Sequence, residues 1–151
     1  MAGTTFQEIF DFFMSTIQDY RLTNLFNVSQ PDFNTFLSAW LIQAIPEFIN
    51  CDQVLTYSSN TFDATLTQKN INVLSLLMKK LWLEWEIDSV LQMENLVQDR
   101  DFRTFSSSQN MTAKQARFNM LKEEVSQQLV NYGLNYSINW SQWFAGQFFI
   151  P

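Results

Sequence analysis

Three clusters of polar residues in this chain have side chains of the kinds used in catalysis. The first, Ser106 to Ser108, offers adjacent hydroxyl groups that a base would activate as nucleophiles. The chain contains no His, so that base would have to be a carboxylate or a Lys. No Gly-x-Ser-x-Gly turn surrounds the serines. We therefore interpret them as part of a solvated loop.

A second cluster offers three carboxylates, Glu84, Glu86 and Asp88, for general acid–base catalysis. In a helix, Glu84 and Asp88 are four residues apart and share one face, whereas Glu86 points elsewhere. This spacing is typical of a solvated helix face, and we favour that interpretation over a catalytic pair.

The third cluster combines Asp99 and Asp101 with Arg100 and Arg103. A calcium loop would need further acidic ligands and a glycine turn, so we expect a mixed-charge loop that faces a protein partner. Such charges set the orientation of an interface more than its affinity. We predict these four residues to be partner-binding.

Cofactor and metal sites are not indicated. With no His and a single Cys, Cys51, the usual zinc ligand sets are excluded, and three Gly residues cannot build a phosphate-binding loop. Met78, Trp82 and Trp85 could line a cofactor or lipid pocket, but their spacing favours ordinary core packing. We expect no catalytic residue, no cofactor and no metal.

The charge balance bears on the partners. A formal net charge of −6 argues against nucleic-acid binding, which needs clustered Lys and Arg. No run of about eighteen apolar residues is present, so we expect no membrane span. The N-terminus lacks a basic region followed by an apolar core, so we expect no signal peptide, and a reducing cytoplasm fits the single Cys.

The elements that position these residues are predicted to be helices. Only three Gly and three Pro interrupt 151 residues, and apolar residues recur at helical spacing in four segments. We predict an all-α fold, a small helical bundle of four to five helices near residues 5–20, 31–50, 68–97 and 113–132. The third helix is apolar around much of its girth and should be central or covered by a partner. The predicted core contains Phe13, Trp40, Leu74, Leu81, Leu121 and Val125.

Helix boundaries and connections follow from local signals. Pro46 must kink or break the second helix, and Gly133 is expected to end the fourth. The predicted connections are Arg21 to Val28, with Leu22, Leu25 and Phe26 tucked into the core, Cys51 to Thr65, and Gln98 to Met111. The predicted start signals are Thr4 or Thr5, Ser29 to Asp32, Thr67, and the capping box Thr112-x-x-Gln115.

The C-terminal segment is aromatic and uncharged. Residues 136–151 hold six aromatic side chains and no Lys, Arg, Asp or Glu, whereas disordered tails are polar and charged. We therefore expect burial on its own core or on another subunit. Its start fits both a strand and a helix. We divide the chain into a helical bundle domain, 1–135, and an aromatic docking tail, 136–151, with Trp140, Trp143, Phe144, Phe148 and Phe149 as partner-binding anchors.

Several segments together resemble one family. They are Phe10-x-x-Phe13-x-x-x-Ile17-x-Asp19-Tyr20-x-Leu22, Trp40-Leu41-x-x-Ala44-Ile45-Pro46-x-Phe48, Leu76-Leu77-Met78-x-x-Leu81-Trp82, and Asp99-x-Asp101-Phe102-x-x-Phe105-Ser106-x-x-Gln109-Asn110 with the helix after it. In this layout the chain resembles the head-to-tail connector (adaptor) proteins of tailed bacteriophages.

The resemblance implies a structural virion protein without catalytic residues. It implies a homo-oligomeric ring, commonly of twelve copies, beneath the portal, with contacts to the portal protein and to tail or stopper proteins. An end segment would dock onto the portal or a neighbouring subunit. The location implied is the virion neck, with the host cytoplasm during assembly.

Two other functions remain open from the residues alone. A small acidic protein-binding module or inhibitor acting on a host protein would be a stable monomer with one exposed patch. An enzyme or small-ligand carrier would have a pocket between the helices that carry Trp. The mass of the protein in solution separates the first of these from a ring.

Overall fold

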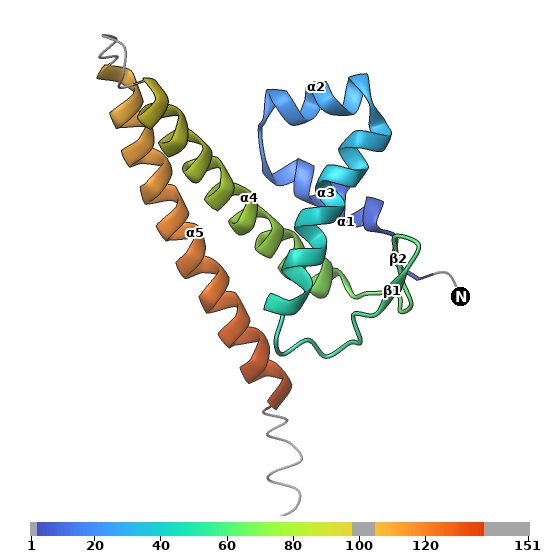
Figure 1. Cartoon of the computed structure of the whole chain (residues 1–151). Helices are drawn as coiled ribbons and strands as arrows, with labels where there is room; N and C mark the ends of the chain where they lie inside the picture. Colours follow the sequence, from blue (N-terminus) through green and yellow to red (C-terminus); the bar gives the residue numbers. More distant parts are fainter. Residues whose placement is uncertain (1–2, 98–104, 138–151) are drawn as a thin grey trace, which may run out of the picture.

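The computed structural model describes residues 3–97 and 105–137. Within these ranges the chain is mostly helical, so the predicted small helical bundle is confirmed, with one short β-hairpin added. No described helix combines the length and hydropathy needed to cross a bilayer. The α-helices are α1 (Phe6–Thr16), α2 (Tyr20–Val28), α3 (Gln30–Ala44), α4 (Gln68–Val97) and α5 (Phe105–Ser137) (Figure 1).

Helix α4 occupies the centre, as its apolar girth predicted. It packs against α1, α3 and α5, and its side chains Leu74, Leu77 and Met78 are completely buried. Helix α5 runs antiparallel beside α4, and the pair extends past the body formed by α1, α2 and α3 (Figure 1). Apolar coverage on three sides explains why the α4 sequence lacks a single polar stripe.

The start of α1 is fixed by two adjacent threonines with different roles. Thr5 is the cap residue, which was one of the two predicted caps. Thr4 is buried, and its Oγ1 accepts a hydrogen bond from the backbone N–H of Leu66 at 2.8 Å. A Cβ on Gly3 would lie 1.6 Å from the carbonyl oxygen of Phe62. The close approach of the N-terminal segment to Phe62 therefore requires glycine at position 3.

The ends of α3 follow the predicted signals. Ser29 is the cap residue, and its Oγ accepts from the N–H of Asp32 at 3.4 Å. The helix ends at Ala44, and Pro46 lies in the short 3₁₀ helix η1 (Ile45–Glu47) that follows. Proline cannot donate the next helical hydrogen bond, so the predicted break is confirmed.

The connection between η1 and α4 contains the hairpin. Strands β1 (Tyr57–Ser58) and β2 (Thr61–Phe62) pair antiparallel through a two-residue loop. Ser59 and Asn60 in this loop have positive φ angles of 49° and 61°, the backbone conformation that tight hairpin turns require. Thr67 then caps α4, as predicted, because its Oγ1 accepts from the N–H of residue 70 at 3.4 Å.

The prediction of a connection over Arg21 to Val28 is wrong, because this segment is helix α2. Its start signal is Asp19, whose Oδ1 accepts from the backbone N–H of Arg21 at 2.8 Å. Leu22 is buried, which gives the short helix an anchor on the core. Packing of this kind stabilises helices that are too short to be stable alone.

The predicted limits of the last helix are also wrong, because α5 begins at Phe105 and ends at Ser137. Thr112 lies inside the helix, and its capping-box pattern is not used as a start. Packing along α4 outweighs the polar composition of the first turns, since tertiary contact supplies most helix stability. The helix continues through Gly133, which costs only about 1 kcal/mol relative to Ala.

Most of the predicted core is confirmed. Phe13, Leu74, Leu121 and Val125 are buried. Trp40 and Leu81, by contrast, are only partly buried and pack at the edge of the core, because their positions face the margin between neighbouring helices.

Truncating core side chains should separate the centre of the core from its edge. We expect Leu74→Ala to lower the free energy of unfolding by about 2–5 kcal/mol, because it leaves a cavity in the centre. Leu81→Ala should cost less, since water already reaches part of that side chain. Urea unfolding followed by circular dichroism measures both. Equal losses would contradict the burial described here.

Candidate functional site

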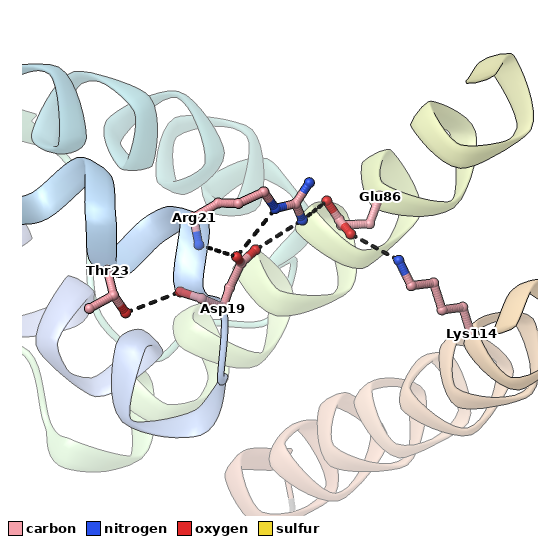
Figure 2. Close-up of polar contacts among 5 residues, drawn as sticks. All are labelled: Asp19, Arg21, Thr23, Glu86 and Lys114. Atoms are coloured by element: carbon pink, nitrogen blue, oxygen red, sulfur yellow. Dashed lines mark hydrogen bonds and ion pairs between the residues drawn. The ribbon is translucent and has the colours of Figure 1, made fainter. Parts of the chain in front are cut away.

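A buried carboxylate joins three helices. Among the described residues, Glu86 of α4 is the one charged residue that is buried, with 4% of its surface exposed. Its Oε1 accepts a hydrogen bond from the guanidinium of Arg21 on α2, and its Oε2 accepts from Nζ of Lys114 on α5 at 3.1 Å (Figure 2). We call this group the Glu86 link.

Asp19 positions Arg21 in the Glu86 link. The guanidinium of Arg21 donates to both carboxylate oxygens of Asp19, at 3.3 and 3.1 Å (Figure 2). Burial acts to raise the pKa of Asp19, but hydrogen bonds and charge from Arg21 outweigh it and hold this pKa below its usual value. Hydrogen bonds to Asp19 and then to Glu86 raise the pKa of Arg21. The arginine thus stays charged and aimed at α4.

The Glu86 link is built as a structural connection. Both carboxylate oxygens of Glu86 face cations, whereas a general base needs an oxygen open to its substrate. Glu84 and Asp88 are exposed, so the predicted solvated face is confirmed and Glu86 does point elsewhere. Its burial was missed. The available signal was its place between the buried residues Leu83 and Ile87.

A second polar group lies near the far end of α5. The hydroxyl of Tyr132 donates to the carboxylate of Asp52, accepts from the backbone N–H of Asp52 at 3.0 Å, and lies 2.7 Å from Oδ1 of Asn70. Asn70 is fully buried, and its Nδ2 donates to Oδ1 of Asp52 at 2.8 Å. Nζ of Lys69 lies 4.0 Å from the centre of the Tyr132 ring, a cation–π contact. We call this group the Tyr132 link.

The two titratable groups of the Tyr132 link have pKa values shifted in opposite directions. Hydrogen bonds from Tyr132 and then Asn70 hold the pKa of Asp52 below its usual value. Burial and the bond to Asp52 raise the pKa of Tyr132. The link therefore favours an ionised Asp52 and a neutral Tyr132.

The described surface also carries three aromatic side chains in mutual contact. Phe36 and Trp40 of α3 and Trp85 of α4 form a triangle with ring centroids 6.0 Å apart in each pair. Trp85 is 41% exposed, and its neighbours Glu84 and Asp88 are exposed carboxylates. Nε1 of Trp40 is shielded from solvent and has no hydrogen-bond partner among the described residues. We call this triangle the aromatic patch.

The Glu86 link should show an asymmetry between its partners. We expect Glu86→Gln to lower the free energy of unfolding by about 1–3 kcal/mol, because it removes the charge of both ion pairs. The loss stays moderate because the freed side chains of Arg21 and Lys114 can return to water. The double change of Arg21 and Lys114 to Ala should cost more, since it leaves a buried carboxylate without a cation. Denaturant unfolding measures both. As a control, Glu84→Gln on the exposed face should leave the free energy of unfolding unchanged. If Glu86→Gln also leaves it unchanged, the Glu86 link does not stabilise the fold.

The Tyr132 link should make stability depend on pH at both extremes. We expect Tyr132→Phe to cost about 1–3 kcal/mol near neutral pH, while Tyr20→Phe at an exposed tyrosine costs nothing. Ionised Asp52 stabilises the fold fully above its usual pKa of 3.8, and this stabilisation is lost as pH falls below that value. Neutral Tyr132 stabilises the fold fully below its usual pKa of 10.0, and this stabilisation is lost at higher pH. Unfolding measured across pH should show the parent–variant difference shrinking at both ends, and a constant difference would contradict this account.

The nine residues predicted from the sequence as partner-binding lie outside the described residues, in 98–104 and 138–151, and their role stays a prediction. Of the predicted tail, only Tyr136 and Ser137 are described, as the last residues of α5. In residues 3–97 and 105–137, no three Cys, Asp or Glu side chains gather as a metal-ligand set. No family model, curated protein or solved structure matches this chain.

Proposed function

We propose that this chain is a structural assembly protein of a tailed-phage virion, an adaptor that forms a ring between the portal and the tail. The observation that carries the proposal is the segment after α5, residues 138–151, with five aromatic side chains and no charged one. Aromatic anchors seated in pockets dominate the energies of protein interfaces. The segment is therefore suited to docking on a protein surface.

The way α5 is attached supports this role. The helix is joined to the rest of the subunit by Lys114, its tenth residue, and by Tyr132 near its end. Ser137, where α5 ends, is five residues past Tyr132. A segment that leaves from a fixed helix end loses less freedom when it docks, because its origin is already oriented.

The remaining parts of the proposal come from the resemblance. They are a ring of about twelve copies, contacts with the portal and with tail or stopper proteins, and a place in the virion neck after assembly in the host cytoplasm. The mixed charges of Asp99, Arg100, Asp101 and Arg103 would set the orientation between subunits.

Removing the docking segment should abolish assembly and leave the subunit folded. We expect a chain ending at Ser137, and a full chain with Trp140, Trp143 and Phe144 changed to Ser, to keep helical content and melting temperature. Both should fail to form the large particles that the parent forms with its partner proteins. Mass measurement in solution at several concentrations checks this.

A matched control changes an aromatic residue outside the segment. Tyr20→Ser removes a side chain that is 90% exposed, and this variant should assemble like the parent. An unfolded or insoluble truncated chain would show that the segment closes the subunit's own core. A full-length chain that stays monomeric with every virion partner would favour the host-protein inhibitor instead.

A further inference from the structure

Helix α2 is held on the rest of the subunit by few contacts. Seven of its nine residues are exposed, and Leu22 is its one buried side chain. Its main neighbour is α3, where the ring of Phe33 lies 5.1 Å from the ring of Phe26 on α2, measured between centroids. Figure 1 shows α2 at the upper end of the body, between the end of α1 and the start of α3. A helix of nine residues is not stable in water alone, so α2 unfolds when it leaves this surface.

Arg21 makes the polar contact that holds α2 on α4. Its guanidinium donates to Glu86, whose side chain is 5% exposed, whereas the side chain of Arg21 is 67% exposed. Arg21 therefore returns to water easily. Glu86 still accepts from Lys114 of α5 at 3.1 Å when Arg21 leaves, so the buried carboxylate is not left without a cation. We propose that α2 is a flap that opens while α1, α3, α4 and α5 stay packed, with the Arg21–Glu86 ion pair as its latch.

The opening has defined limits along the chain. On one side, Nζ of Lys79 donates to the carbonyl oxygen of Thr16 at 3.1 Å and holds the last residue of α1. On the other side, the side chain of Ser29 caps α3 by accepting from the N–H of Asp32, a contact that does not involve α2. The segment that opens is therefore residues 17–28.

Opening uncovers a surface that the closed subunit hides. Phe33 is 2% exposed when the ring of Phe26 lies against it, and it meets solvent when α2 leaves. One oxygen of Glu86 loses its cation at the same time. The open form thus presents an aromatic ring of α3 and a carboxylate oxygen of α4. This inference does not depend on the assembly role proposed above.

Hydrogen exchange of the full chain, measured at single amides by nuclear magnetic resonance, tests the proposal. We expect the hydrogen-bonded amides from Thr23 to Ser29 to exchange faster than those from Phe36 to Leu41 in α3, each rate being taken relative to an unstructured peptide. The difference should be at least about tenfold, because local opening releases the first set and only unfolding of the core releases the second.

A matched pair of variants identifies the latch. Arg21→Gln removes the cation on α2, and we expect it to speed exchange in α2 by about three- to tenfold and to leave α1, α3 and α4 unchanged. Lys114→Gln removes the cation that α5 supplies to the same carboxylate. It should not speed exchange in α2, because Glu86 then depends on Arg21 alone.

The proposal is overturned if α2 exchanges as slowly as α3 in the parent. It is also overturned if Arg21→Gln speeds exchange equally in all helices, or if Lys114→Gln speeds exchange in α2 as much as Arg21→Gln does. The parent measurement decides whether α2 opens separately even where a variant fails to fold.

Discussion

The rest of this structure depends on the burial of α4 on three sides. Leu74, Leu77 and Met78 can be fully buried only because α1, α3 and α5 each cover part of the same helix. Complete coverage leaves no solvent for a charged side chain on the covered faces, and a buried carboxylate is costly unless it is paired. Glu86 therefore requires Arg21 and Lys114, and this requirement joins α2 and α5 to the centre.

Local chemistry explains which parts of the fold could be predicted from the sequence. The caps Thr5, Ser29 and Thr67 and the break at Pro46 act within a single turn, so short patterns reveal them. Helix α2 was missed although Asp19 is a cap of the same kind, because Arg21 to Val28 was interpreted as a connection between two longer helices. The start of α5 was missed because the helix begins at Phe105, seven residues before Thr112. Its packing on α4 has no signature in the local sequence.

The polar links could not be predicted for a related reason. Glu86 is 65 residues from Arg21 and 28 from Lys114, and Tyr132 is 80 residues from Asp52. Each partner sits on a different element, so sequence spacing has no bearing on their meeting. The aromatic patch is an intermediate case, because Phe36 and Trp40 are one helical turn apart but Trp85 comes from α4. Spacing could place the first two on one face, and only the fold adds the third.

The two polar links together determine where the C-terminal segment begins. Apolar side chains along α4 and α5 tolerate small shifts of one helix past the other, whereas the hydrogen bonds of Lys114 and Tyr132 do not, because their geometry is directional. These two residues are eighteen positions apart, about 27 Å along α5, so α5 is held at two well-separated points. Its last turn is thereby fixed relative to α3 and to Trp85. The aromatic segment that follows therefore starts from a helix end whose direction the fold sets.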